Sequence, residues 1–299
     1  MKSYLGIDIG GSAVKFGWGD SKNGLQYFSS IPIKKKNLSE FKLIIEKVLQ
    51  EVETRTGFSK ISGIGIGSPG TIDVNSGKVV GVNPNLPFWV GHDPRELIPA
   101  SLELPVFVDN DANLMALAEA HYQKAKTALG ITVGSGIGSG IIIDGKIYRG
   151  ASGYAGELGH VIVVDSGAKC NCGRLGCLEA YASVDGLRNR LADESPHYTD
   201  MQLSQILAIK AADELVAGHI AFGQKMLCGA IANAIIALEP EAVIFGGGGM
   251  DVGLYSIVDI KREIEELLPE VNRSKVQIKH AIHGNKAGVI GAIMMLEQA

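Results

Sequence analysis

A short pattern near the start of this 299-residue chain returns in its middle, and this repeat limits the folds that the chain can adopt. Residues 5–10 read LGIDIG and residues 129–134 read LGITVG, so four of the six positions are identical. In both places an apolar run leads into a glycine-rich turn and a second apolar run, which predicts a β-hairpin. A match of six residues can arise by chance, but the shared order of elements predicts two halves built on one plan.

The hydrophobic patterns of the chain predict alternating strands and helices. Apolar residues at helical spacing over 39–56 predict a helix that Ser39 caps and Gly57 ends. The first hairpin is expected over 4–19, and the second strand of the later hairpin over 141–143. Further strands are expected at 61–66, 104–108, 242–245 and 276–280, and further helices after 109–113 to about 122 and at 178–237, 259–268 and 286–297. This order predicts an α/β protein with two lobes and a cleft between them.

Composition excludes several classes of protein. Hydrophobic residues make up 46% of the chain and charged residues 20%, which excludes disorder for most of it. The net charge is −4 and acidic and basic residues are mixed along the chain, so no electrostatic pattern indicates binding to nucleic acid or to an anionic membrane. The longest apolar stretches, 228–238 and 287–296, are too short to span a bilayer. The N-terminus lacks a signal-peptide pattern, so we expect a cytoplasmic protein.

Three clusters of glycine each follow a predicted strand, at 10–11, 134–140 and 246–249. There the backbone N–H groups can converge on a phosphate without obstruction by Cβ atoms. Neither the P-loop spacing nor the dinucleotide-binding fingerprint is present. One such cluster is commonly an ordinary tight turn, whereas three together favour a nucleotide, and the other glycines are expected in turns. Asp8, beside the first cluster, either caps the turn or holds Mg²⁺ near the phosphates.

A group of cysteines indicates a metal site. Cys170, Cys172 and Cys177 form a C-x-C-x4-C motif, and His160 precedes it. Three thiolates and one imidazole satisfy tetrahedral Zn²⁺, and a set with no vacant position is typical of a structural site. Free thiols grouped by chance are the alternative. The metal would hold the loop and fix the orientation of the His160 ring.

Four segments of the chain carry a resemblance to a known family. They are DIGGSAVK at 8–15, DNDAN at 109–113, GSGIGSGIIIDGKIYRGASGYAGELGH at 134–160 and CNCGRLGCLEAYAS at 170–183. Over essentially its whole length the chain resembles the ROK family of sugar kinases and repressors, and within it the bacterial glucokinases. The resemblance implies the actin-like, hexokinase-type (ribonuclease H-type) pair of lobes. We expect residues 1–115 with helix 285–299 to form the smaller lobe and 116–284 the larger one.

The resemblance also implies an acceptor site for a sugar. Asp109 and Asp111 flank Asn110 at a strand end, where the spacing alone leaves a helix N-cap as the alternative for either acid. By resemblance, Asp111 is the catalytic base that takes the proton of a primary hydroxyl, and Asn110 binds the sugar. The further sugar-binding residues that the resemblance implies are Gly70, Asn85, Glu157, His160 and Glu179.

The nucleotide is expected on the glycine clusters and on residues beside them. Most family members carry Thr where Ser135 stands, and the hydroxyl is kept. The expected nucleotide-binding residues are Asp8, Gly10, Gly11, Ser12, Lys15, Gly134, Ser135, Gly136, Gly246, Gly247 and Gly248.

The resemblance implies a kinase that uses ATP and Mg²⁺ to phosphorylate a hexose, with glucose as the first candidate. Other acceptors remain open, among them N-acetylmannosamine, fructose and allose, as does polyphosphate as the donor. A sugar-sensing repressor is the alternative from another class. Such repressors begin with a helix-turn-helix domain, whereas here the first hairpin starts at Tyr4, so we expect the kinase. The resemblance also implies a homodimer or a dimer of dimers.

Overall fold

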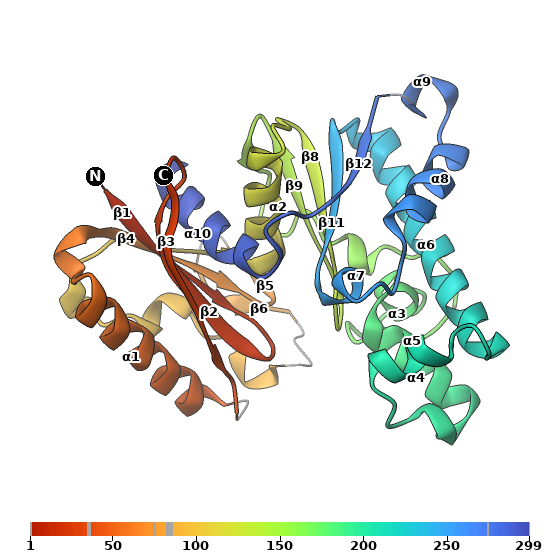
Figure 1. Ribbon diagram of the computed structural model, residues 1–299, viewed down its shortest axis with the longest axis horizontal. Helices are drawn as coiled ribbons and strands as arrows, with labels where there is room; N and C mark the ends of the chain where they lie inside the picture. Colours follow the sequence, from red (N-terminus) through yellow and green to blue (C-terminus); the bar gives the residue numbers. More distant parts are fainter. Residues whose placement is uncertain (1, 35–36, 74–75, 82–85, 274, 299) are drawn as a thin grey trace.

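Two five-stranded sheets with the same order of strands form the frame of the protein (Figure 1). The structure is a computed structural model, which describes residues 2–34, 37–73, 76–81, 86–273 and 275–298. The first sheet has the order β3 (Gly24–Pro32), β2 (Ala13–Asp20), β1 (Ser3–Ile9), β4 (Ile61–Ser68) and β7 (Val106–Asn110). The second has the order β10 (Lys146–Ile147), β9 (Ile137–Ile143), β8 (Ala128–Val133), β11 (Ala242–Gly246) and β12 (Gln277–His280).

The repeated sequence occupies the same place in both sheets. LGIDIG lies in β1 and at its end, LGITVG lies in β8 and at its end, and each of these strands is central. Each pairs antiparallel with the strand that follows it and parallel with the next strand on its other side. The prediction of two halves on one plan is therefore confirmed. The second strand of the later hairpin begins at Ile137, before the expected 141, because the alternating glycines there hide the strand pattern.

Several helix and strand boundaries in the structure differ from those predicted from the sequence. Helix α1 (Leu38–Arg55) is capped by Asn37, whose side chain accepts a hydrogen bond from the N–H of Glu40, so the prediction of Ser39 as the cap is wrong. Gly57 has a φ of 78° and follows the helix end, as expected. The strand expected at 104–108 is β7, and the strand β3 and a two-stranded ribbon, β5 (Thr71–Ile72) with β6 (Val79–Val80), were not expected.

The region expected to be helical over 178–237 is divided into four helices. Ser183 caps α4, because its side-chain oxygen accepts a hydrogen bond from the N–H of Gly186, and Pro196 begins a short 3₁₀ turn before the next helix. The four are α3 (Glu179–Ala182), α4 (Val184–Glu194), α5 (Leu203–Ile209) and α6 (Glu214–Leu238). The chain continues through α7 (Gly248–Asp251), α8 (Ile257–Leu267), α9 (Glu270–Arg273) and α10 (Ala287–Gln298).

Helix α6 is the one helix in the described residues that is long and apolar enough to cross a membrane by length and composition. It extends well beyond the apolar stretch at 228–238 that the sequence suggested. Half of its apolar window is buried inside the fold, and the helix packs on α3, α4 and α8. This burial is what the core helix of a compact lobe shows, and one such helix is weak evidence for a membrane span.

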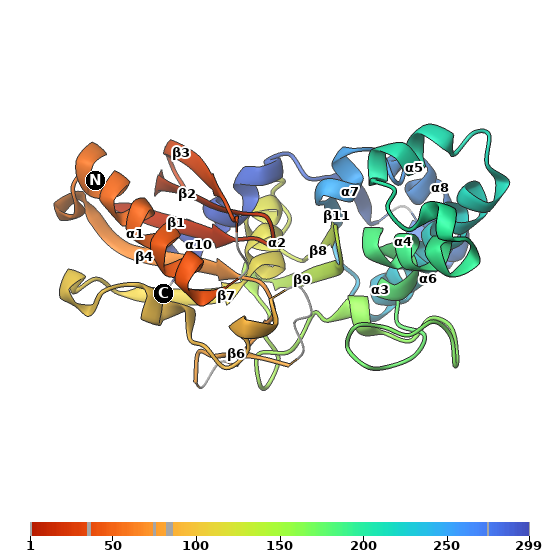
Figure 2. The same ribbon diagram turned by 90° about the horizontal axis from the view of Figure 1, so that it is seen from below.

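Two helices connect the halves by an exchange of positions (Figures 1 and 2). Helix α2 (Asp111–Tyr122) follows β7 of the first sheet but packs on β8 and β9 of the second. Helix α10 follows the second sheet but packs on β1 and β4 of the first. The two helices also pack against each other. The division of the chain after residue 115, which falls inside α2, stays a prediction.

Glycines inside regular elements make this packing close. A Cβ on Gly65 of β4 would overlap the carbonyl oxygen of Ala292, and a Cβ on Gly291 would overlap that of Leu114. On the other sheet, a Cβ on Gly140 of β9 would lie 2.8 Å from the Cα of Asn113. The expectation that the glycines outside the three clusters lie in turns is therefore wrong for Gly65 and Gly291, and Gly140, the last glycine of the second cluster, lies within β9. They let helix backbone lie directly on sheet backbone.

We predict that Gly291→Ala lowers the free energy of unfolding by about 1–3 kcal/mol, because the added methyl group overpacks the contact between α10 and α2. Gly218→Ala is the control, since Gly218 lies on an exposed part of α6 with open space around the added methyl. It should raise the same free energy by about 0.5–1 kcal/mol through helix propensity. Urea unfolding followed by circular dichroism measures both, and equal effects would contradict the packing argument.

Candidate active site

One cavity of about 470 Å³ lies between the two sheets and collects most of the predicted site residues. Of the residues predicted to bind sugar or nucleotide, the cavity is lined by Asp8, Gly10, Gly11, Ser12, Lys15, Gly70, Asn110, Asp111, Gly134, Ser135, Gly136, Glu157, His160, Glu179, Gly247 and Gly248. Gly246 does not line it, because it ends β11 and is buried there. Asn85 lies outside the described residues.

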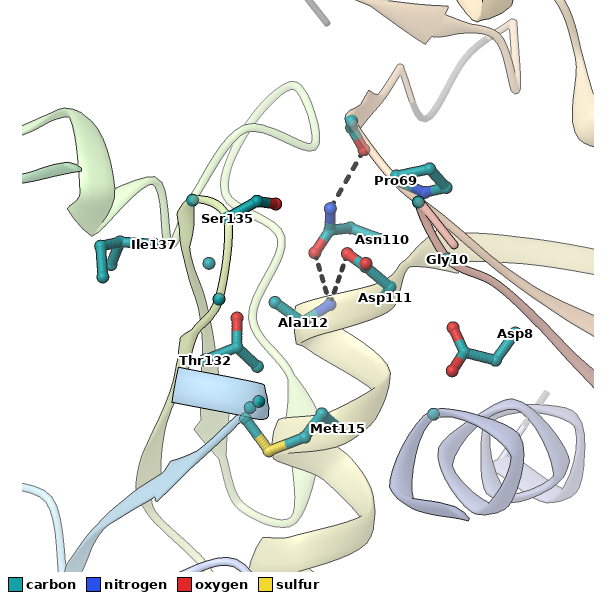
Figure 3. Close-up of a pocket in the computed structure, with 18 of the residues that line it drawn as sticks. Asp8, Gly10, Pro69, Asn110, Asp111, Ala112, Met115, Thr132, Ser135 and Ile137 are labelled. Carbon is teal, nitrogen blue, oxygen red and sulfur yellow. Dashed lines mark hydrogen bonds between the residues drawn. The ribbon is translucent and has the colours of Figure 1, made fainter. Parts of the chain in front are cut away.

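The turns of the two hairpins face the cavity from different sheets. Gly10 and Gly11 belong to the β1–β2 turn, and Gly134, Ser135 and Gly136 to the β8–β9 turn. Figure 3 shows Gly10 on one side of the cavity and Ser135 on the other. The duplicated hairpin thus places two glycine-rich turns opposite each other.

Asn110 and Asp111 stand where β7 ends and α2 begins (Figure 3). Asn110 is the N-cap of the helix, because its Oδ1 accepts hydrogen bonds from the N–H groups of Ala112 and Asn113. Its Nδ2 donates to the carbonyl oxygen of Gly70 at 3.1 Å. Neither flanking acid is therefore the cap, and the helix sends them to different environments. Asp111 lines the cavity, whereas Asp109 is buried at the end of β7.

The carboxyl group of Asp111 has an unusual acidity. Burial raises its pKa to about 7, and the nearby negative charge of Asp8 adds to the increase. A hydrogen bond from the N–H of Ala112 and the charge of Lys15 oppose the shift. A carboxylate with a pKa near neutrality is a much better proton acceptor than an ordinary one.

Asp8 lies at the end of β1 and is paired with a cation. Its Oδ2 accepts a hydrogen bond from Nζ of Lys15 at 3.1 Å, and the two residues are also neighbours in the hairpin register. Burial raises the pKa of Asp8, and Lys15 opposes that increase. A Cβ on Gly288 of α10 would lie 2.7 Å from Cγ of Asp8, so the helix covers this carboxylate closely.

Two predicted sugar-binding acids already have partners in the protein. Oε2 of Glu179 accepts a hydrogen bond from the N–H of Ile137 at 3.0 Å, and a Cβ on Gly136 would overlap this oxygen. Glu179 therefore helps to hold the β8–β9 turn in place. Oε1 of Glu157 accepts a hydrogen bond from the hydroxyl of Thr71 at 2.8 Å, which joins the two halves. Each carboxylate still has acceptor capacity that faces the cavity.

The four predicted metal ligands come together beside the cavity. The donor atoms of His160, Cys170, Cys172 and Cys177 all lie within 4.8 Å of one another. Nδ1 of His160 is 3.6 Å from Sγ of Cys170, and the Sγ atoms of Cys172 and Cys177 are 3.7 Å apart. Burial raises the pKa of the Cys170 thiol, and a divalent cation would counteract that effect. The donor set and its spacing fit tetrahedral Zn²⁺.

Comparison with known proteins establishes the relationship that the motifs suggested. The family model described as "ROK family" matches residues 4–299. The chain belongs to the ROK family. A glucokinase of Halalkalibacterium halodurans is 34% identical over 99% of this chain and 95% of its own. An N-acetyl-D-glucosamine kinase of Salmonella typhimurium is 30% identical, covering 98% of each chain.

Solved structures agree with this assignment. A ROK family glucokinase from Streptomyces griseus, in complex with glucose and AMPPNP, superposes with a TM-score of 0.81 at 27% identity. The alignment covers 99% of this ROK chain and all of that one. The fold is therefore the actin-like pair of lobes that the resemblance implied.

Some lining residues of the ROK chain were not predicted. Thr132 occupies the position of Asp8 in the second copy of the repeat, so the repeat could have revealed it. Asp251 lies two residues after the third glycine cluster, which is a weaker signal. Met115 lies one helical turn after Asp111 and lines the cavity for that reason. Asn285 lies in the connection before α10, and no sequence pattern predicts that it lines the cavity.

We predict that Asp8→Asn lowers the pKa of Asp111 in this ROK protein, because it removes a neighbouring negative charge. The pKa should stay above the ordinary 3.8, since burial is the larger cause of the shift. Carboxyl-detected NMR titration measures it, with Asp111→Asn used to assign the signal. Asp20→Asn, at the end of β2 that leads into the β2–β3 turn, is the control and should leave the pKa of Asp111 unchanged. An unchanged pKa of Asp111 in Asp8→Asn would show that the two acids do not interact.

Proposed function

We propose that this ROK-family sugar kinase transfers the γ-phosphoryl group of ATP to the primary hydroxyl of a hexose, with glucose as the first candidate. The observation that carries the proposal is Asp111, a half-buried residue with a carboxyl pKa of about 7 that shares one cavity with both glycine-rich turns. The similarity to a glucokinase over nearly the whole of both chains supports glucose.

Asp111 would act as the general base. In its ionised form it accepts the proton of the hydroxyl while that oxygen attacks the phosphorus in line. Asn110 would bind the sugar beside Asp111 through the second N–H of its Nδ2 group, because its other side-chain hydrogen bonds are made within the protein. Because Asn110 is fixed to Gly70 and to the first turn of α2, the acceptor oxygen would meet a rigid site.

The glycine-rich turns would bind the nucleotide through backbone N–H groups, with the hydroxyls of Ser12 and Ser135 beside them. Gly246 would act indirectly, by shaping the turn that presents Gly247 and Gly248. Lys15 would neutralise part of the phosphate charge and keep Asp8 ionised. Asp8 would hold Mg²⁺, which supplies neutralisation of charge on the phosphates when bound.

The sugar hydroxyls would be bound by Glu157, Glu179 and His160, with Gly70 beside them and Asn85 outside the described residues. Carboxylates accept strong hydrogen bonds from vicinal hydroxyls, and an imidazole nitrogen can accept or donate one. His160 both lines the cavity and belongs to the Cys₃His cluster, so we propose that a structural Zn²⁺ fixes its ring.

A different acceptor is the second candidate within the same reaction. The similarity to an N-acetyl-D-glucosamine kinase, at 30% identity over 98% of both chains, favours N-acetylhexosamines. N-acetylmannosamine, fructose and allose as acceptors, and polyphosphate as donor, also belong to the proposal.

We further propose that the protein is cytoplasmic and forms a homodimer or a dimer of dimers. In each chain, residues 1–115 and 285–299 would form the smaller lobe and residues 116–284 the larger one.

The proposal is tested by a coupled assay of the purified protein. We expect ATP-dependent phosphorylation of glucose with the highest kcat/KM in a panel of hexoses and N-acetylhexosamines, each also tried with polyphosphate. A higher kcat/KM for N-acetylglucosamine would replace glucose by the second candidate. Absence of phosphorylation for every pair of donor and acceptor, in protein that retains its zinc, would overturn the kinase assignment.

We predict that Asp111→Asn lowers kcat by about 10²–10⁴-fold, because it removes the proton acceptor. Sugar affinity, measured by calorimetry, should change little. The kcat/KM of the unaltered enzyme should rise as the pH increases through about 7, since only the ionised carboxyl accepts a proton, and this limb should be absent in the variant. Asp259→Asn, on the surface of α8, is the control. A variant with near-normal turnover would show that Asp111 is not the base.

We predict that the purified protein contains about one zinc per chain, bound by the Cys₃His cluster. Removal of the zinc with a chelator should lower sugar affinity and activity together, because His160 loses its fixed orientation. Metal analysis before and after treatment, with re-addition of zinc, measures the effect. Cys228→Ser is the matched control, since Cys228 lies apart from the cluster on α6 and should leave the zinc content unchanged.

A further inference from the structure

Asp109, two residues before Asp111, is a buried carboxylate that no step of the proposed reaction uses. Its side chain is 5% exposed. Oδ1 accepts hydrogen bonds from the N–H of Asn110 and from Nδ2 of Asn113, each at 2.8 Å. This oxygen therefore holds both the N-cap residue of α2 and the first turn of that helix. A buried carboxylate needs a counter-charge as well, because hydrogen bonds alone rarely offset its desolvation.

The counter-charge comes from the other half of the molecule. Nε and Nη2 of Arg149 lie 2.7 and 2.6 Å from Oδ2 of Asp109. Arg149 follows β10 of the second sheet, whereas Asp109 ends β7 of the first. A guanidinium group that places two donors on one carboxylate oxygen fixes direction as well as charge. The pair thus joins the two halves next to Asn110, which lines the cavity.

Arg149 also begins the segment that presents the sugar-binding side chains. Residues 149–157 connect β10 to the 3₁₀ turn Leu158–His160, and the segment ends on Glu157. It makes two further contacts with the first half: the hydroxyl of Tyr154 donates to Oδ2 of Asp73 at 3.1 Å, and Glu157 accepts from Thr71. Of the three side chains, that of Arg149 is the one held by a buried acid.

We propose that Asp109 and Arg149 are positioning residues that set Asp111 and the 149–157 segment at a fixed separation across the cavity. The inference deepens the proposed function and rests on it. On one side the pair orients the start of α2, which carries Asn110 and Asp111. On the other it anchors the segment that carries Glu157. Loss of the ion pair would misplace the proton acceptor relative to the hydroxyl that it serves, while the glycine-rich turns keep their own supports.

The test uses Arg149→Ala and Arg149→Lys in the full chain, with Arg262→Ala as the matched control. Arg262 also pairs with an aspartate, but on the exposed surface of α8. We expect Arg149→Ala to lower kcat by about 10–100-fold and to raise the sugar KM, with the ATP KM within twofold of normal. Arg149→Lys should recover part of the loss, because it restores the charge but not both donors. Methylguanidinium at millimolar concentration should partly rescue Arg149→Ala, since the side chain of Arg149 is 39% exposed.

Hydrogen exchange of the amides of residues 110–113 gives a readout that does not depend on activity. These amides should exchange faster in Arg149→Ala than in the unaltered protein, while those of α8 should not change. If the unaltered protein phosphorylates no sugar, the proposed function fails and the exchange rates still decide the inference. Normal exchange at 110–113, or loss of activity with unchanged KM values and no rescue by methylguanidinium or Lys, would overturn it.

Discussion

The reciprocal packing of α2 and α10 is the constraint on which the rest of the structure depends. Each helix leaves one sheet and covers the other, and the two then pack against each other. Neither half can therefore complete its own layer without a helix from the other. The site lies beside this crossing, with Asp111 at the start of α2 and Gly288 near the start of α10. The relative positions of the residues that line the cavity are fixed because backbone segments pack at distances that only glycine permits.

A second buried carboxylate secures the crossing from its far end. Glu119 of α2 is fully buried and accepts hydrogen bonds from the N–H groups of Ile282 and His283, at 2.9 and 2.8 Å. These residues belong to the connection that leads into α10. Helix α2 is thus held at both ends by acids, with Asp109 just before its start and Glu119 near its last turn. Charge and hydrogen bonds fix where the helix lies along its axis, and small residues fix how closely it lies to the sheets.

Much of the fold could be predicted from the sequence because its signals are local. The repeat of LGIDIG gave the two equivalent hairpins, and the spacing of Cys170, Cys172 and Cys177 indicated that their thiols would meet. What could not be predicted depends on contacts between distant segments. Nothing local reveals that Arg149 reaches Asp109, or that Gly65 and Gly291 serve packing rather than turns. Asn37 and Ser39 are both suitable N-cap residues by type. Asn37 is the cap because the first helical turn begins at Leu38, which the sequence pattern does not determine.

The two copies of the repeat differ at two positions, and one of these differences changes the chemistry of the cavity. Where the first strand carries Asp8, with Lys15 beside it, the second carries Thr132, and both side chains line the same cavity (Figure 3). A duplicated frame by itself makes no distinction between its two sides. At these equivalent positions one side of the cavity carries a carboxylate and the other a hydroxyl, which adds to the uneven charge that Asp111, Glu157 and Glu179 already give its lining. The exchange of Asp8 for Thr132 thus gives two hairpins of the same shape different interactions with a ligand whose charge is unevenly distributed.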